Sequence, residues 1–395
     1  MASVTAPATK ASTNKESYYT AGQAQLIWSR FKRNRAAMIS AILLLFFVIV
    51  GIFAPFISPY APTIAGKDPD YLNGAPQILR FWDENGFSIV PFTYTVERTR
   101  SAATNLRWVE TINKEERRYL RFFVKGWDYY LIDFFIDLPG RNYDVRWRAL
   151  KMDRHLFGMD KGFIHFFGTD KDGKDLFSRT VHAVGISLAI GTVGVILSFV
   201  LALIIGGIAG YFGGWIDGVI QIITDAVRVV PTIPLYMAIA AFLPDDWSAE
   251  ARFFFISIVL GLLGWPTLAR RIRTHLLAER TQDYVLAAKL AGASPRRIIS
   301  RHLLPSFTSY IIVDLVITFP YTVLAETSLS FIGLGLKDPV NSIGVLLKNA
   351  TNVDVMLNYQ WQFIPVPIFI ILVLAFVFVG DGLRDAADPY AQGKK

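Results

Sequence analysis

The stretch DYVLAAKLAGASPRRIISRHLLP, from Asp283 to Pro305, decides how this chain folds, because it is a polar segment between long apolar ones. Its first half contains a run of strong helix formers, residues 286–290. Gly292 follows, at the position where helices commonly end in a left-handed residue that only glycine adopts cheaply. The first helix is therefore expected to stop there.

The second half of the stretch carries the signals of a new helix. Ser294 is a good N-cap, and Pro295 is a good first residue because its missing N–H is one of the donors that a helix start leaves unpaired. We expect this helix to run to about Leu303 and to end at Pro305. One face of the resulting helical hairpin carries only small side chains, those of Ala287, Ala288 and Ala291. A partner could approach this face closely.

The segments on either side of the hairpin are apolar enough to cross a membrane. Hydrophobic residues make up 53% of the 395 residues, and about 20 apolar residues cross the hydrocarbon layer. The chain is therefore predicted to be an all-α, multi-pass membrane protein with six helices. Four spans contain no Asp, Glu, Lys or Arg: residues 36–57, 183–209, 253–269 and 361–380. Two more, residues 216–243 and 306–329, are interrupted by charged residues, namely Asp225, Arg228, Asp314 and Glu326.

Basic residues near the spans predict the orientation of the chain. Lys32, Arg33 and Arg35 precede the first span and place the N-terminus in the cytoplasm. Six crossings return the C-terminus to that side and put the hairpin there too. The net charge of +8 then reflects topology, and we expect no nucleic-acid partner. No cleavable signal peptide is expected, because the first apolar stretch is long enough to stay as an anchor.

These predictions divide the chain into five parts. They are a cytoplasmic N-terminal tail (1–35), the first span (36–57), a periplasmic insertion (58–180), a five-helix core (181–382) with the hairpin at 281–305, and a cytoplasmic C-terminal tail (383–395). The insertion holds twenty Phe, Trp or Tyr between Phe81 and Phe167. These rings either form a subdomain core or an interfacial belt, or they present a docking surface or a vestibule wall.

Motifs for catalysis and metal binding are missing from the sequence. It contains no GxSxG or HExxH pattern and no cysteine, and none of its five histidines are spaced i,i+4. It also lacks the GxxxxGK[ST] loop that holds nucleotide phosphates. We therefore expect no enzyme activity, no metal site and no cofactor in this chain, and any ATP would be bound by another subunit.

The hairpin resembles the EAA loop of bacterial ABC importer permeases, in which EAA is followed by three residues, Gly, nine residues, Ile, one residue and Leu-Pro. The matching positions are Ala287, Ala288, Gly292, Leu304 and Pro305, whereas Leu286 replaces Glu and His302 replaces Ile. The resemblance implies a surface that couples to the ATPases, made of Tyr284, Leu286, Ala287, Ala288, Gly292, Ala293, Ser294, Pro295, Arg296 and Arg297.

Other stretches resemble the dipeptide and oligopeptide permeases of that class. FGTDKDGKDLFSR (167–179) is similar to their FGTDxxGRDxxSR segment, with Lys174 in place of Arg. SLSFIGLGL (328–336) and GDGLRDAADP (380–389) are similar to their LSFLGLG and GDxLRDxLDP segments. The similarity covers about residues 26–60 and 165–390. The long insertion between these two regions is not typical of the shorter members of the class, whose outer loop is much briefer.

The resemblance implies a type I ABC importer permease fold and the C-type subunit of a peptide importer in the bacterial inner membrane. It implies four kinds of partner: a sister permease, two ATPase subunits that bind ATP and Mg, a periplasmic or lipid-anchored solute-binding protein, and the lipid bilayer. Two alternatives stay open. One is import of nickel or an oligosaccharide by the same architecture, and the other is an ion-coupled carrier whose membrane acids bind protons or cations.

The charges within the spans require protein or water as neighbours, because a charge at the helix centre costs roughly 2.5 to 3.5 kcal/mol on insertion scales. Asp225 and Arg228 are spaced i,i+3 and could pair with each other. Together with Asp314 and Glu326, they either pair between helices or line the translocation path.

Overall fold

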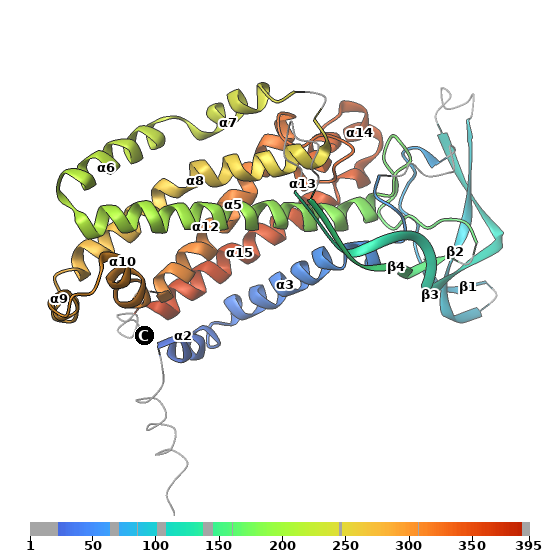
Figure 1. Ribbon diagram of the computed structural model, residues 1–395. Helices are drawn as coiled ribbons and strands as arrows, with labels where there is room; N and C mark the ends of the chain where they lie inside the picture. The colour runs from blue at the N-terminus through green and yellow to red at the C-terminus, as the bar shows by residue number, and fades with distance from the viewer. Residues whose placement is uncertain are drawn as a thin grey trace, which may run out of the picture.

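The computed structural model describes residues 23–63, 71–84, 86–100, 108–136, 145–159, 161–244, 247–306 and 308–388. Long helices form an elongated bundle, and a β-sheet lies at one of its ends (Figure 1). We call this the sheet end, and the opposite end, which carries α9, the hairpin end. Residues 1–22 of the predicted N-terminal tail and residues 389–395 of the predicted C-terminal tail lie outside the described residues.

Five helices are long and apolar enough to cross a membrane. They are α3 (Arg35–Ile52), α5 (Leu176–Phe212), α8 (Ala249–Glu279), α12 (Thr308–Ile332) and α15 (Pro365–Ala387). Two shorter helices, α6 (Gly214–Val229) and α7 (Thr232–Ala241), pass the same test together but are bent by 78°. Pro231 lies at this break, where its ring disfavours a helical conformation of the preceding residue. The six predicted helices are thus present when the bent pair is counted as one span.

The helix ends extend beyond the predicted spans. α5 begins within the predicted insertion, α8 continues to Glu279, and α15 reaches into the predicted C-terminal tail. The short helix α4 (Ala54–Ile57) follows α3, and α2 (Gln23–Phe31) lies within the predicted N-terminal tail. An apolar stretch indicates only the part of a helix that lies in the hydrocarbon layer. The helices themselves continue beyond that layer. Short helices α13 (Ile343–Ala350), α14 (Val353–Asn358) and η4 (Gln360–Phe363) connect α12 to α15.

The insertion is a β-sheet, which the all-α class did not include, although that class is right for the bundle. Its strands are β1 (Arg80–Asp83), β2 (Gly86–Arg100), β3 (Trp108–Ile136) and β4 (Val145–Met159). They pair antiparallel in the order β1-β2-β3-β4. The β-branched and aromatic residues of the insertion favour strands. The all-α prediction rested instead on long apolar stretches, which indicate membrane helices.

The aromatic rings of the insertion divide between its core and its surface. Phe92, Tyr94, Tyr129 and Phe157 are buried. Phe157 also packs against Phe177 of α5, with ring centroids 5.6 Å apart, so the sheet and the bundle share one apolar contact. Other rings are exposed, among them Phe81, Trp82, Phe87, Phe122, Phe123 and Trp147.

The two ends of the insertion are hydrogen-bonded to each other at its base. The bonds run from Asn73 N to Asp170 O (2.7 Å), from Thr169 N to Gly74 O (2.9 Å) and from Gln77 N to His165 O (2.9 Å). The segment that leaves the bundle therefore lies beside the segment that returns to it.

Arg179, near the start of α5, is buried with only 1% of its surface exposed. Its Nε donates to Asn341 Oδ1 (2.5 Å), its Nη2 donates to Asp338 Oδ2 (2.7 Å), and its Nη1 pairs with Asp170. Lys174 also contacts Asp338, at 2.8 Å. Burial tends to raise the pKa of Asp338, but the charge of Arg179 and the hydrogen bond from Lys174 outweigh it and hold that pKa below its usual value.

Arg179→Met is expected to lower the free energy of unfolding by about 3–5 kcal/mol, because it leaves the buried carboxylate of Asp170 without its cation. Lys174→Met is the matched control. Asp338 is 35% exposed and keeps Arg179, so the control should cost less than about 1 kcal/mol. Chemical denaturation of the detergent-solubilised chain measures both, and equal losses would contradict this account.

Glycines allow α5 and α8 to pack closely. A Cβ at Gly206 would lie 2.5 Å from the carbonyl oxygen of Ala269, and one at Gly210 would lie 2.9 Å from that of Arg273. These distances are too short for any side chain. At the adjacent Gly207 a Cβ would make an ordinary contact, 3.8 Å from a methyl group of Ile299.

Gly206→Ala should therefore push α5 and α8 apart and destabilise the chain by roughly 1–3 kcal/mol. Gly207→Ala adds the same methyl group one residue along the helix. It should be neutral or stabilising by up to about 1 kcal/mol, because alanine restricts the unfolded chain more than glycine does. Thermal unfolding in detergent would compare the two variants, and a larger loss at Gly207 would refute the packing argument.

Candidate functional site

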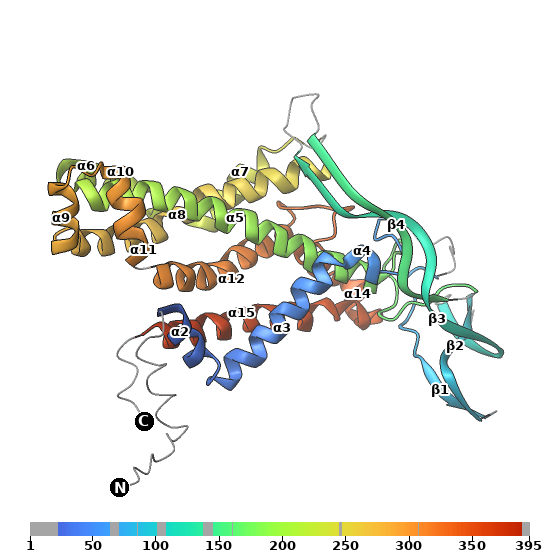
Figure 2. The same ribbon diagram turned by 60° about the horizontal axis from the view of Figure 1, so that its bottom comes forward.

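The predicted hairpin lies between α8 and α12 at the hairpin end (Figure 2). It consists of α9 (Asp283–Leu290), α10 (Pro295–Arg297), the π-helical turn η3 (Ile298–Leu303) and α11 (Leu304–Ser306). Gly292 has a φ of +78°, the left-handed conformation that its position predicts. The Ser294 hydroxyl accepts a hydrogen bond from Arg297 N at 3.4 Å, as an N-cap should.

The hairpin ends one residue later than predicted. Its helical turns continue past Pro305, through α11, to Ser306. A difference of one residue is within the usual variation of helix ends.

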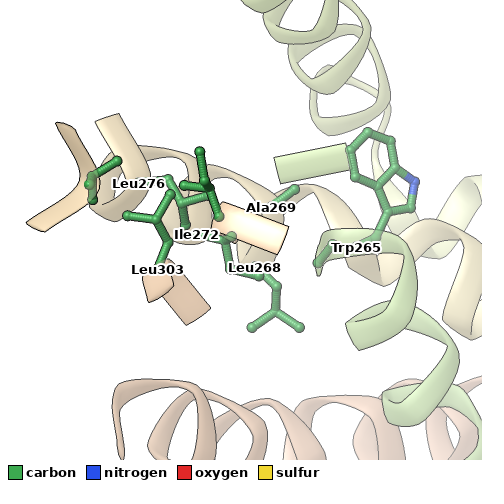
Figure 3. Packing of buried hydrophobic residues seen from close by; sticks show 9 residues of the cluster. Trp265, Leu268, Ala269, Ile272, Leu276 and Leu303 are labelled. Carbon is green, nitrogen blue, oxygen red and sulfur yellow. The ribbon is translucent and has the colours of Figure 1, made fainter. Parts of the chain in front are cut away.

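The hairpin is anchored on the bundle by apolar side chains. Val285, Ile298 and Leu303 are fully buried. Figure 3 shows Leu303 close to residues of α8, and the hairpin residues form one cluster with Ala202 of α5 and with Trp265, Leu268, Ala269, Ile272 and Leu276 of α8. The position of the hairpin is therefore fixed by α5 and α8.

Most of the predicted coupling residues lie away from this cluster and are exposed. They are Tyr284, Leu286, Ala287, Gly292, Ser294, Pro295, Arg296 and Arg297. Ala288 and Ala293 are half-buried and pack against the cluster. They therefore lie between the exposed coupling residues and the buried side chains of the bundle. Burial and a hydrogen bond to Glu279 raise the pKa of Tyr284, which keeps its hydroxyl neutral.

Sequence reasoning missed Leu290, which is 90% exposed. It follows Leu286, itself 45% exposed, by four residues, so the two leucines share one side of α9. That spacing on a short polar hairpin was the signal that could have identified it. We call the exposed residues Tyr284, Leu286, Ala287 and Leu290 the α9 face.

Charged residues of α8 form ion pairs with the neighbouring helices. Arg271 contacts Asp314 of α12 at 2.5 Å, and Arg273 binds both carboxylate oxygens of Asp217 of α6. These pairs join α8 to the helices on both sides of it. They lie near the hairpin end, because α8 leads directly into the hairpin.

The predicted pairing between Asp225 and Arg228 is wrong. Asp225 pairs with Arg270 of α8, whereas Arg228 is exposed and forms no ion pair with any described residue. The sequence could not reveal this, because the partner comes from a helix more than forty residues away.

Glu326 lies fully buried, apart from the other intramembrane charges. Its carboxylate accepts hydrogen bonds from Ser330 (2.9 Å), Ser187 (3.2 Å) and Thr327 (3.4 Å). Ser187 belongs to α5, so Glu326 joins α12 to α5. Asp225, Asp314 and Glu326 thus all bind side chains of neighbouring helices.

Two family models match the chain. Residues 202–391 match the model of the binding-protein-dependent transport system inner membrane component, and residues 22–76 match that of the N-terminal TM domain of oligopeptide transport permease C. The chain is also 35% identical over 226 residues to the dipeptide transport system permease protein DppC of Bacillus subtilis (strain 168), across 57% of this chain and 68% of that protein. The chain belongs to the family of binding-protein-dependent transport system inner membrane components.

Further relatives are similar to this permease. The oligopeptide transport system permease protein OppC of Bacillus subtilis (strain 168) is 34% identical over 226 residues, which cover 57% of this chain and 72% of that protein. A solved structure, of the MetNI methionine ABC transporter in inward-facing conformations, matches with a TM-score of 0.42 and 20% identity, over 53% of this chain and 96% of that chain. The family models and the permease relatives confirm the predicted family and, with it, the type I ABC importer permease fold.

Gly292→Ala should loosen the hairpin of this permease, because a left-handed alanine costs roughly 1–2 kcal/mol. A Cβ there would touch nothing within 4 Å, so the effect isolates backbone conformation. We expect faster amide hydrogen exchange in α9 and α10. Gly218→Ala, at an exposed helical glycine that likewise has nothing within 4 Å, should leave the hairpin unchanged. Equal exchange in the two variants would contradict the role given to Gly292.

Proposed function

We propose that this permease is the membrane-spanning subunit of an ATP-driven importer of dipeptides and oligopeptides, and that its hairpin couples it to the ATPase subunits. The observation that carries this proposal is the α9 face. It exposes large apolar side chains, such as Leu290, on a hairpin that lies beyond the long apolar stretches of the bundle. Exposed apolar surface outside the membrane is typical of a protein interface. The peptide class is supported by the dipeptide and oligopeptide permeases among the relatives.

The proposed coupling runs through the buried cluster beneath the hairpin. A push on the α9 face moves Val285 and Leu303, and these residues pack on α8. α8 is joined by ion pairs to α6 through Asp217 and to α12 through Asp314. Displacement of the hairpin therefore moves these three helices, and this switches the permease between inward- and outward-facing states.

The partners follow from this architecture. They are a sister permease that completes the pathway, two ATPase subunits that hold ATP and Mg, and a periplasmic or lipid-anchored solute-binding protein that delivers the peptide. Both termini and the hairpin lie in the cytoplasm, and the sheet lies outside the inner membrane. The chain itself performs no catalysis and holds no cofactor.

Ala287→Arg tests the coupling. Ala287 is exposed, so the variant should fold, but a long charged side chain would stand in the middle of the α9 face. We expect ATP-dependent uptake of a labelled tripeptide by membrane vesicles to fall at least tenfold, corresponding to about 1.4 kcal/mol or more of lost coupling. The ATPase subunits should also be lost from affinity purifications of the tagged chain.

Ile89→Arg is the matched control, since it places the same side chain at an exposed position of β2 at the opposite end of the molecule. It should leave ATPase association unchanged. Normal uptake and normal ATPase recovery by Ala287→Arg would refute the proposal. Uptake of nickel or an oligosaccharide, with no uptake of peptides, would leave the coupling intact and refute the peptide class.

A further inference from the structure

A cavity of about 850 Å³ opens between α5, α8, α12 and α15 in the half of the bundle toward the hairpin. The ion pairs described above account for only part of its lining. The cavity has a charged region, formed by Arg270, Arg271, Asp314 and Arg384, and an apolar region that includes Phe199 and Leu268.

The cavity follows one face of α12. Tyr310, Asp314, Ile317 and Tyr321 line it, and their spacing of three or four residues places them along the same side of the helix. From Tyr310 to Tyr321 the helix rises roughly 16 Å, which is about half the thickness of a hydrocarbon layer. The lining thus changes from charged near the hairpin end to apolar and aromatic toward the membrane centre.

The charged region is positive, because three arginines face a single lining carboxylate. Arg271 pairs with that carboxylate, Asp314, yet about half of the Arg271 side chain stays exposed. Arg270 pairs with Asp225, which is outside the lining. Arg384 is exposed and forms no ion pair with any residue in the described ranges, although its charge acts on Asp314. Two guanidinium groups therefore remain accessible to an anion.

We propose that this cavity binds an anionic phospholipid, with its phosphate against Arg271 and Arg384 and one acyl chain along Ile317 and Tyr321. Arginine pairs well with phosphate, and basic pockets between membrane helices on the cytoplasmic side are suited to anionic headgroups. A zwitterionic peptide fits less well, because no lining carboxylate lies at the apolar end to receive its amino terminus. This lipid site goes beyond transport and does not require the proposed coupling.

Native mass spectrometry of the purified chain tests the site, with phosphatidylglycerol and phosphatidylethanolamine added in equal amounts. The wild-type chain should retain phosphatidylglycerol preferentially. Arg384→Gln should reduce this retention five- to tenfold, which converts to about 1–1.4 kcal/mol. Arg384 is exposed, so the variant should fold. Arg271→Gln should also reduce phosphatidylglycerol retention, but it leaves Asp314 unpaired. Arg384→Gln alone is therefore enough for the test.

Arg296→Gln is the control, because it removes the same charge at the same end of the molecule but outside the cavity. It should leave retention unchanged. Equal retention of the two lipids, or equal loss in Arg296→Gln and Arg384→Gln, would overturn the proposal. Displacement of phosphatidylglycerol by trialanine would also overturn it and would assign the cavity to the peptide path.

Discussion

The buried guanidinium of Arg179 is the interaction on which the sheet end depends. It joins the last residues of the insertion, through Asp170, to the loop after α12, through Asp338 and Asn341. A buried cation needs carboxylate partners, and the buried carboxylate of Asp170 needs the cation, so this cluster holds the three segments together. The segment FGTDKDGKDLFSR thus supplies three members of this cluster, Asp170, Lys174 and Arg179.

The hairpin end is organised by different forces. Apolar packing by Val285, Ile298 and Leu303 fixes the hairpin, and ion pairs of α8 connect it to α6 and α12. Packing transmits a displacement because a close-packed cluster has no free space to absorb it. Partly exposed ion pairs add little stability but keep neighbouring helices in register. The polar groups at the two ends therefore differ, since they are buried and hold three chain segments at one end, and are partly exposed and join neighbouring helices at the other.

The sequence predicted what local chemistry decides. Gly292 and Ser294 stand where the structure uses them, because a left-handed turn and a helix cap depend on a few adjacent residues. Asp225 was assigned the wrong partner, since its arginine lies on another helix and only the tertiary fold brings it near. The cavity beside Arg384 was not predicted for the same reason. The sheet was not predicted because long apolar stretches indicate membrane helices and carry no information about the segment between them.

The closed base of the insertion bears on how such a protein could have evolved. The match to the permease C family model ends at residue 76, immediately before Gln77, whose backbone N–H donates to His165 in the returning segment. A segment whose two ends meet can lengthen, shrink or be exchanged without moving the helices on either side of it. An ancestral transporter could thus have acquired the sheet as a cassette, and selection could reshape its outer surface while the machinery in the membrane stayed the same.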